Sequence, residues 1–412
     1  MLAVNNRRVE RLLQGLARFS ASEQGVTRLA YSSLDRQAQD WLLSEVRDLG
    51  LSVREDAVGN VFLRREGAMP QLPPVACGSH LDTVIHGGAY DGMCGVVGAL
   101  EALYMLGKTE LKRSIEVIIF RAEESSRFGF ATIGSKLLAG KASLADKKLA
   151  DAAGKDGVTL AEALRGWGGD PENFAQAKVQ RGAYKCFAEL HIEQGKVLEE
   201  TENEIGIVHN IAAPTRFKLH VQGMADHSGA TPMGFRRDAL VSAAKLVLAV
   251  QEAATEEKDN GTVATVGVLE VEPASINVVP GAATLWVDLR GVDKESIRRT
   301  LAEIRQAAEF VAVEDKVGIS WEMLTADDPV ALDGGLALLS EAICKERGIK
   351  YLHMNSGAGH DAMHMAAIAP TTMLFIPCRG GISHNPAEFA KLDDICRGIK
   401  VLAALLAKEA DE

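Results

Sequence analysis

The order of predicted strands and helices changes sharply in the middle of the chain. Within residues 213–328, hydrophobic periodicity predicts strand, helix, strand, strand, helix and strand, at 215–222, 237–255, 262–270, 282–290, 294–312 and 317–323. This β-α-β-β-α-β order is the split βαβ, ferredoxin-like arrangement. We therefore expect residues 213–328 to form a domain of their own, inserted into a larger one.

The flanking residues follow a different order. A helix is predicted at 34–50, strands at 51–56, 60–65 and 74–79, a helix at 95–107 and a buried strand at Ser114–Ala122. After Pro329 the chain returns to helix, strand, helix and strand, at 335–347, 350–354, 360–367 and 371–376. This order favours an α/β domain with a mixed, mostly parallel sheet and helices on both faces. Since 412 residues exceed the usual size of one core, we expect a discontinuous core domain at 1–212 and 329–412 and an inserted domain, the lid, at 213–328.

The charge and cysteine content limit the class of partner. The formal net charge of −11 argues against nucleic-acid and anionic-membrane partners, which need a basic surface. The six cysteines include no C-x-x-C pair and are typical of reduced thiols in a cytoplasmic protein. Residues 1–19 resemble an amphipathic helix rather than a signal peptide, and apolar runs such as Val117–Phe120 are too short to span a membrane. A small-molecule substrate is expected.

Side chains that commonly bind metals occur in five short segments, at predicted strand ends or in tight loops. The segments are Gly78–Thr83, Gly87–Gly92, Ala122–Glu124, Glu189–Gly195 and Gly381–Pro386.

Each of these segments suggests a ligand for a metal ion. His80 could present a ring nitrogen to a metal while Asp82 fixes its tautomer. A glycine turn could bring Asp91 toward His80, and its two carboxylate oxygens could bridge two cations. Glu123 and Glu124, if extended, point to opposite sides, so one could bind metal while the other holds water. A lone histidine is usually solvated and an Asp-Gly pair is usually a turn, but the joint occurrence favours a metal centre.

The five segments, in this order, resemble the di-zinc metallopeptidase-like amidohydrolases, which include aminoacylases and dinuclear carboxypeptidases. More narrowly, the segments at His191–Gly195, His227–Met233 and Gly357–Ala362 resemble the hydantoinase/carbamoylase branch. That branch contains N-carbamoyl-L-amino-acid hydrolases, allantoate amidohydrolases and β-ureidopropionases. The resemblance extends over essentially the whole chain, including the insert.

The resemblance implies two divalent metal ions in each subunit, either zinc or manganese, cobalt or nickel. It assigns five ligands, with Asp91 as the bridge between the ions: His80, Asp91, Glu124, His191 and His384. A set of histidines and carboxylates without a thiolate suits these metals. Glu123 corresponds to the general base, which would take a proton from water and pass it to the leaving nitrogen.

The resemblance also implies the residues that bind substrate. Arg290 and Asn277 would grip a substrate carboxylate, and Gln194 would lie near the scissile group. His227 would reach the active site of a partner subunit and stabilise the oxyanion, which suggests a homodimer joined through the lid. Arg216 could bind a second polar group or project into solvent. Two further positions belong to the substrate loop, namely Gly357 and Ala358.

These assignments favour a metal-dependent amidohydrolase. The leading hypothesis is cleavage of the ureido group of an N-carbamoyl-L-amino acid or a related ureido acid, with release of ammonia and carbon dioxide. An allantoate amidohydrolase that forms ureidoglycine is the close alternative. An aminoacylase or dipeptidase would use the same metals on a plain amide. An inactive binding protein is disfavoured, because all the expected ligands and the base are present.

Overall fold

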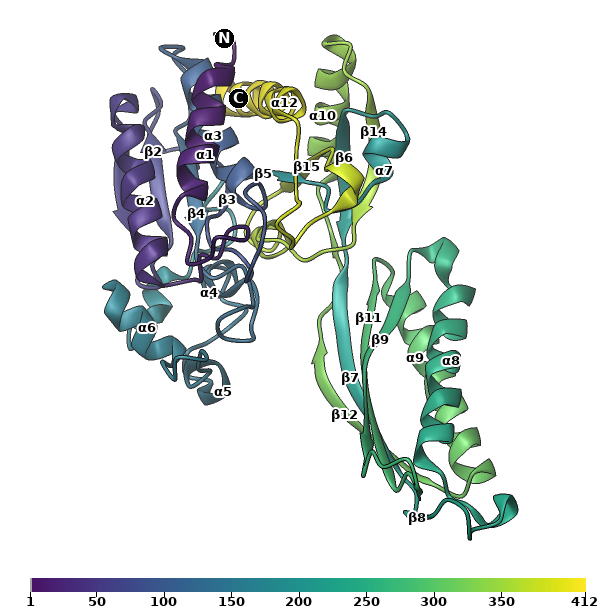
Figure 1. Ribbon diagram of the computed structural model, residues 1–412. Coiled ribbons are helices and arrows are strands. Elements are labelled where there is room, and N and C mark those ends of the chain that lie inside the picture. The colour runs from purple at the N-terminus through teal and green to yellow at the C-terminus, as the bar shows by residue number, and fades with distance from the viewer. Residues whose placement is uncertain (1) are drawn as a thin grey trace. The chain divides into compact units, whose positions relative to one another are not determined.

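The computed structural model describes residues 2–412, which form two compact units (Figure 1). The first unit contains the residues up to His209 together with Ala331–Ser356 and His360–Glu412. The second contains Asn210–Val330 and the short segment Gly357–Gly359. The chain therefore leaves the larger unit, forms most of the smaller one, and returns.

A nine-stranded mixed sheet forms the centre of the first unit, in the order β1-β2-β4-β3-β5-β15-β6-β13, with β14 paired to β6. The strands are β1 Ser52–Glu55, β2 Val61–Arg65, β3 Val75–His80, β4 Ile115–Phe120, β5 Cys186–Ile192, β6 Ile205–Ile211, β13 Val330–Ala331, β14 Tyr351–Ser356 and β15 Thr371–Ile376. The neighbours β4, β3, β5 and β15 are parallel to one another. Their carboxyl ends therefore lie at one edge of the sheet, where ligand sites of α/β proteins usually form.

Helices cover both faces of this sheet. On one face, Leu190 of β5 packs against α3 and α12, at positions where Gly98 and Gly398 leave room for its side chain. The neighbouring side chain of Glu189 points to the opposite face, where it accepts a hydrogen bond from the amide of Ala362 in α11. The helices are α1 Asn6–Ala17, α2 Ser33–Glu45, α3 Met93–Leu106, α4 Ile133–Leu138, α5 Lys147–Ala150, α6 Leu160–Trp167, α7 Val197–Glu200, α10 Gly334–Glu346, α11 Ala362–Met365 and α12 Leu392–Asp411.

The second unit contains a four-stranded antiparallel sheet in the order β12-β7-β11-β9. Its main elements are β7 Ala213–Gln222, α8 Ala239–Glu256, β9 Val263–Glu272, β11 Ala282–Gly291, α9 Lys294–Glu314 and β12 Gly318–Ala326. The two helices pack on one face of this sheet and bury alternate apolar residues of β7 and β11 (Figure 1). A separate pair of two-residue strands, β8 Asp226–His227 and β10 Val278–Val279, lies beyond the end of β7.

The predicted fold class is confirmed: a mixed central sheet with helices on both faces accompanies a ferredoxin-like unit. The predicted strand at Ser114–Ala122 is too long, because β4 ends at Phe120 and Ala122 adopts a φ of 50°. The sequence reading did not include β6, α12 or the short helices α4–α6. Among residues 2–412, no helix combines the length and apolar character needed to cross a membrane.

Candidate metal centre

The predicted metal ligands gather at the carboxyl edge of the four parallel strands. His80 is the last residue of β3, and His191 is the penultimate residue of β5. Glu124 lies shortly after β4, and His384 lies in the loop between β15 and α12. Asp91 immediately precedes the glycine at the start of α3. The topology therefore brings together all five residues from five separate segments.

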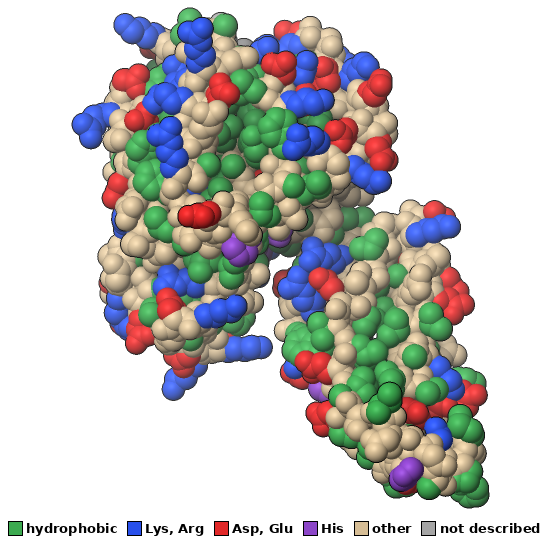
Figure 2. All heavy atoms as spheres, viewed as in Figure 1, with side chains coloured by type: hydrophobic (Ala, Val, Ile, Leu, Met, Phe, Trp, Pro, Cys, Tyr) green, Lys and Arg blue, Asp and Glu red, His purple; other side chains and the backbone are tan. Residues whose placement is uncertain are grey.

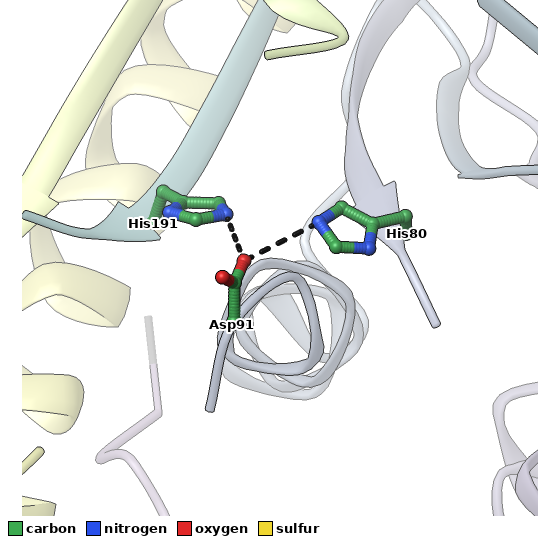
Figure 3. A group of neighbouring side chains, drawn as sticks. All are labelled: His80, Asp91 and His191. Carbon is green, nitrogen blue, oxygen red and sulfur yellow. Dashed lines mark ion pairs between the residues drawn. The ribbon is translucent and has the colours of Figure 1, made fainter. Parts of the chain in front are cut away.

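The first group consists of His80, Asp91 and His191, all of them buried (Figure 3). Oδ1 of Asp91 lies 3.0 Å from Nε2 of His191 and 3.5 Å from Nε2 of His80. Gly92 makes this approach possible, because a Cβ atom there would lie 2.5 Å from the His80 ring. Its φ of 68° also favours glycine. One carboxylate oxygen is thus faced by two imidazole nitrogens.

The hydrogen bonds of His191 show that this group fits a cation. Nδ1 of His191 donates to the carbonyl of Ile192 at 2.9 Å, and the Gly92 amide donates to Nε2 at 3.3 Å. Nε2 therefore offers a lone pair, yet it faces a carboxylate oxygen of Asp91 at 3.0 Å. Two acceptors at this distance repel each other unless positive charge lies between them. Imidazole and carboxylate together are ligands that zinc and similar metals prefer.

The second group shares Asp91 and adds Glu124 and His384. Nε2 of His384 lies 3.2 Å from Oδ2 of Asp91 and 3.2 Å from Oε1 of Glu124. Gln194 lies beside them, and its amide donates to Oδ2 of Asp91 at 2.7 Å. The two oxygens of Asp91 therefore face two different groups of ligands, as a carboxylate that bridges two cations would.

Asp82 forms hydrogen bonds with His80 and with the backbone of Glu123 and Glu124. Nδ1 of His80 donates to the main-chain carbonyl of Asp82 at 3.0 Å, whereas the carboxylate lies 3.8 Å away. The tautomer of His80 is therefore fixed by the backbone of Asp82. The carboxylate instead accepts the main-chain N–H groups of Glu123 and Glu124 at 3.3 and 3.0 Å. These two glutamates follow the turn at Ala122 and are not on a strand, so strand alternation does not explain how their side chains diverge.

Burial, neighbouring charges and hydrogen bonds shift the pKa values of the acids and bases in this cluster. Burial, and then the charge of Glu124, raise the pKa of Glu123 well above its usual range, although His80 opposes them. Burial lowers the pKa of His80, but Glu123, Asp91 and Asp82 outweigh it and hold the pKa well above its usual range. Hydrogen bonds to Asp91 and Glu124 raise the pKa of His384 to about 11. The cluster thus stabilises added positive charge.

Two buried residues next to the cluster were not among the predicted ligands. Glu189, His191 and His360 form a third group whose ligand atoms lie close together. The oxygens of Glu189 already accept hydrogen bonds from Ser79 and the Ala362 amide, and Nε2 of His191 faces Asp91. Glu189 and His360 therefore stay outside the proposed ligand set, and the His360 ring packs against the His191 ring with centroids 4.6 Å apart. The alternation Glu189-Leu190-His191 was the available signal, but no strand was predicted there from the sequence, whereas β5 spans Cys186–Ile192.

The predicted carboxylate-binding arginine lies in the second unit, on the sheet face opposite α8 and α9. Arg290 donates from Nε and Nη2 to the two oxygens of Asp288 at 3.1 and 3.0 Å, and from Nη1 to the Gly357 carbonyl at 3.2 Å. Nε of Arg216, directly across the strand pair, lies 3.3 Å from Asp288. Arg216 therefore belongs to the same group. The three side chains line a cavity of about 410 Å³. Ala358 is half-buried and follows Gly357 in the same unit.

His227 and Asn277 lie together at the other end of this sheet. Val278, next to Asn277, pairs with His227, and the Ser228 amide donates to the carbonyl of Asn277. Nδ1 of His227 accepts the amides of Gly229 and Ala230 at 3.0 and 3.2 Å. Its proton must therefore be on Nε2, which suits a donor to an oxyanion.

The predicted carboxylate grip is not assembled within one chain. Asn277 precedes Ala282, the first residue of β11, whereas Arg290 is near the end of that strand. Eight residues of extended strand span about 26 Å. Within a single chain, Asn277 and Arg290 therefore lie too far apart to hold the same carboxylate.

Known proteins are similar in sequence to this chain over most of their length. The model of peptidase family M20/M25/M40 matches residues 76–408. The ureidoglycolate hydrolase of Arabidopsis thaliana is 39% identical over 415 residues, which cover 99% of this chain and 87% of that protein. The N-carbamoyl-L-amino acid amidohydrolase of Geobacillus stearothermophilus is 38% identical over 380 residues, 92% of each chain.

A solved structure agrees with these matches. AtUAH in complex with glyoxylate superposes with a TM-score of 0.84 at 37% identity, covering 100% of this chain and 99% of that one. The matched family depends on two metal ions, and the buried histidine and carboxylate groups of this chain are suited to hold them. The chain belongs to the peptidase family M20/M25/M40, in its hydantoinase/carbamoylase branch, and is an amidohydrolase of non-peptide carbon–nitrogen bonds.

Proposed function

We propose that the chain hydrolyses the ureido group of a small carboxylate-bearing ureido acid, such as an N-carbamoyl-L-amino acid, to an amine, ammonia and carbon dioxide. The observation that carries this proposal is the position of Asp91 between two groups of ligands. Relatives named for ureidoglycolate and for N-carbamoyl amino acids are almost equally similar, at 39% and 38% identity. Overall similarity therefore supports a ureido acid as the substrate but does not distinguish ureidoglycolate from an N-carbamoyl amino acid.

In this proposal, His80, Asp91 and His191 hold one divalent cation, and Asp91, Glu124 and His384 hold the other. When bound, such cations would lower the pKa of a water molecule and polarise the scissile carbonyl. Zinc is the expected metal, with manganese, cobalt or nickel as alternatives that the same donors accept.

Glu123 moves the proton in the proposed reaction. Glu123 is a buried residue, 8% exposed, and its carboxylate lies 3.8 Å from Nε2 of His80. It takes a proton from the attacking water and later delivers it to the departing nitrogen. The Asp82 carboxylate holds the backbone of Glu123 and Glu124, so base and ligand keep a fixed separation.

The proposed oxyanion donor comes from a second copy of the chain. The proton on Nε2 of His227 is directed away from its own turn, and Asn277 lies beside it. Because Asn277 and Arg290 of one chain cannot meet at one carboxylate, we assign Asn277 and His227 to the partner's site. Arg290 and the cations would then belong to one subunit and the two tip residues to the other.

The surface of the second unit supports a homodimer. Strand β9 is an outer strand of its sheet, and α8 packs beside it. Figure 2 shows hydrophobic side chains at the surface over these two elements. They include Val241 and Leu248, which lie on one side of α8 and are 51% and 64% exposed. Pairing of the two copies through this surface would cover the edge strand and these side chains.

An ammonia-release screen of the metal-reconstituted protein tests the proposed function. The substrates are N-carbamoyl-L-amino acids, ureidoglycolate, allantoate, N-acetyl amino acids and dipeptides. We expect ammonia from ureido acids and no cleavage of the acetyl and peptide substrates. Cleavage of dipeptides alone would overturn the proposal, and so would turnover that survives complete removal of metal by a chelator.

A further inference from the structure

A buried glutamate outside the proposed ligand set connects the two loops that carry Asp91 and His384. Glu388 lies four residues after His384 and is only 5% exposed. Its Oε1 accepts the main-chain N–H groups of Tyr90 and Asp91 at 3.0 and 3.1 Å. Its Oε2 accepts the hydroxyl of Ser383 at 2.9 Å. One carboxylate thus joins segments almost 300 residues apart in sequence.

Ser383 links this carboxylate to the proposed cation ligand. Its Oγ lies 2.9 Å from Oε2 of Glu388 and 3.2 Å from Oδ2 of Asp91, but a hydroxyl has only one proton to donate. When that proton is donated to Glu388, Oδ2 accepts only the Gln194 amide, and its second lone pair remains available to a cation. When it is donated to Asp91, it competes with the cation for the same oxygen.

The surrounding backbone is shaped to hold this side chain. A Cβ atom on Gly88 would lie 2.1 Å from Oε1 of Glu388 and 2.4 Å from its Cβ. The glycine is required here for space, because its φ is not in the left-handed region. The loop before Asp91 therefore packs directly on the Glu388 carboxylate, and neither can move independently.

We propose that Glu388 is a positioning residue for the second cation site, the one formed by Asp91, Glu124 and His384. It fixes the backbone of Asp91 relative to the His384 loop, and it draws the Ser383 proton away from Oδ2 of Asp91. This inference rests on the proposed function, because it takes Asp91 and His384 as metal ligands. It adds a residue that touches neither the cation nor the substrate.

The test measures metal binding. Metal-free protein is titrated with Zn²⁺ in a competing chelator buffer, and metal content is checked by elemental analysis. Wild type is expected to bind two equivalents. In Glu388→Gln, the amide nitrogen donates to Ser383 and turns the Ser383 proton onto Asp91. We expect this variant to unfold at the wild-type temperature and to bind one of the two equivalents about 10- to 100-fold more weakly.

A double-mutant cycle isolates the effect of the Ser383 proton. In the background of Ser383→Ala, the Ser383 proton no longer competes for Asp91, and the Gln194 amide is the same in both backgrounds. Glu388→Gln should therefore change zinc affinity much less than it does alone. Asp56→Ala is the matched control, because Asp56 also accepts two main-chain N–H groups and a side-chain donor, from Asn60, away from the metal ligands. It should lower the unfolding temperature and leave both zinc affinities unchanged.

The outcomes separate this inference from the proposed function. If wild type binds two equivalents and Glu388→Gln binds both with wild-type affinity, the role of Glu388 is wrong and the metal centre stands. Equal weakening in Glu388→Gln and Asp56→Ala would also overturn it, as a general effect of destabilisation. If wild type itself binds fewer than two equivalents, the proposed two-metal function fails.

Discussion

At the scale of single residues, the cluster around Asp91 surrounds one carboxylate with histidines, whose lone pairs can face a carboxylate only when positive charge lies between. The hydrogen bonds of His191 are the clearest sign, since one ring nitrogen is committed to a carbonyl and the other accepts an amide. The pKa of Glu123 is raised mainly by burial and by the nearby charge of Glu124. This shift also reflects a cluster of carboxylates that positive charge would stabilise. Bound cations would lower that pKa and make the carboxylate available as a base.

Glu123→Gln tests the role of that base. The amide keeps the size of the side chain and cannot take a proton, so we expect kcat to fall about 10²- to 10⁴-fold. Metal content and unfolding temperature should match wild type. The control is Glu116→Gln, at a buried carboxylate bonded to Tyr184 and paired with Arg54. Substantial turnover in Glu123→Gln would contradict the assignment of Glu123 as the general base.

Asp288 provides a second test at this scale. It fixes the Arg290 guanidinium through two hydrogen bonds and also pairs with Arg216. Asp288→Asn would loosen Arg290, so we expect KM for ureido acids to rise roughly tenfold, about 1.4 kcal/mol of binding, with little change in kcat. Glu322→Gln is the control, because Glu322 pairs with Lys218 and His220 on the same sheet. An equal rise in KM in the control would contradict the prediction.

The sequence predicted most of the proposed metal ligands but not the buried residues that position them. His80, Asp91 and His191 could be predicted because their segments, at strand ends or in tight loops and in this order, resemble those of a known family. Glu388 could not be predicted in the same way. Its partners are mainly backbone N–H groups of a loop far away in sequence, and no side-chain pattern records such bonds.

At the scale of elements, strong periodicity predicted structure well. The order of strands and helices in residues 213–328 was predicted correctly. Buried and exposed residues alternate along strands such as β7, and the helices α8 and α9 are long enough to show a period. The helices α4–α6 have four to eight residues, too few turns to show a period. For α6, the Thr159 and Glu162 capping box was a usable signal. The end of β4 was misplaced because its apolar run continues to Ala122, which instead makes a turn with positive φ.

The exposed face of α8 leads to a prediction about assembly. Leu248→Lys places a charge among the apolar side chains beside β9, and burial of that charge in a dimer would be costly. We expect this variant to be monomeric at concentrations where wild type is dimeric, as measured by light scattering during gel filtration. Phe310→Lys on α9, at a residue 67% exposed, is the control and should remain dimeric. A wild-type protein that is monomeric and active would contradict the proposed dimer.

At the scale of the whole molecule, the proposed function divides the site residues between the two units and between two copies of the chain. The cation ligands and Glu123 belong to the first unit, and Arg290, Asn277 and His227 belong to the second. Within the second unit, a strand length of about 26 Å separates Arg290 from the tip that carries Asn277 and His227. Under the proposed function, Arg290 of one copy and the tip residues of its partner would bind the same substrate.

Subunit mixing tests this arrangement directly. Glu123→Gln and His227→Ala should each be nearly inactive alone, but a mixed dimer contains one site with an intact base and an intact partner histidine. Half of the dimers in an equal mixture are mixed and each has one working site, so activity should recover to about a quarter of wild type. The control replaces Glu123→Gln by the double variant with Leu248→Lys, which cannot pair and should restore nothing. If the first mixture also gives only the sum of its components, His227 does not act across the dimer.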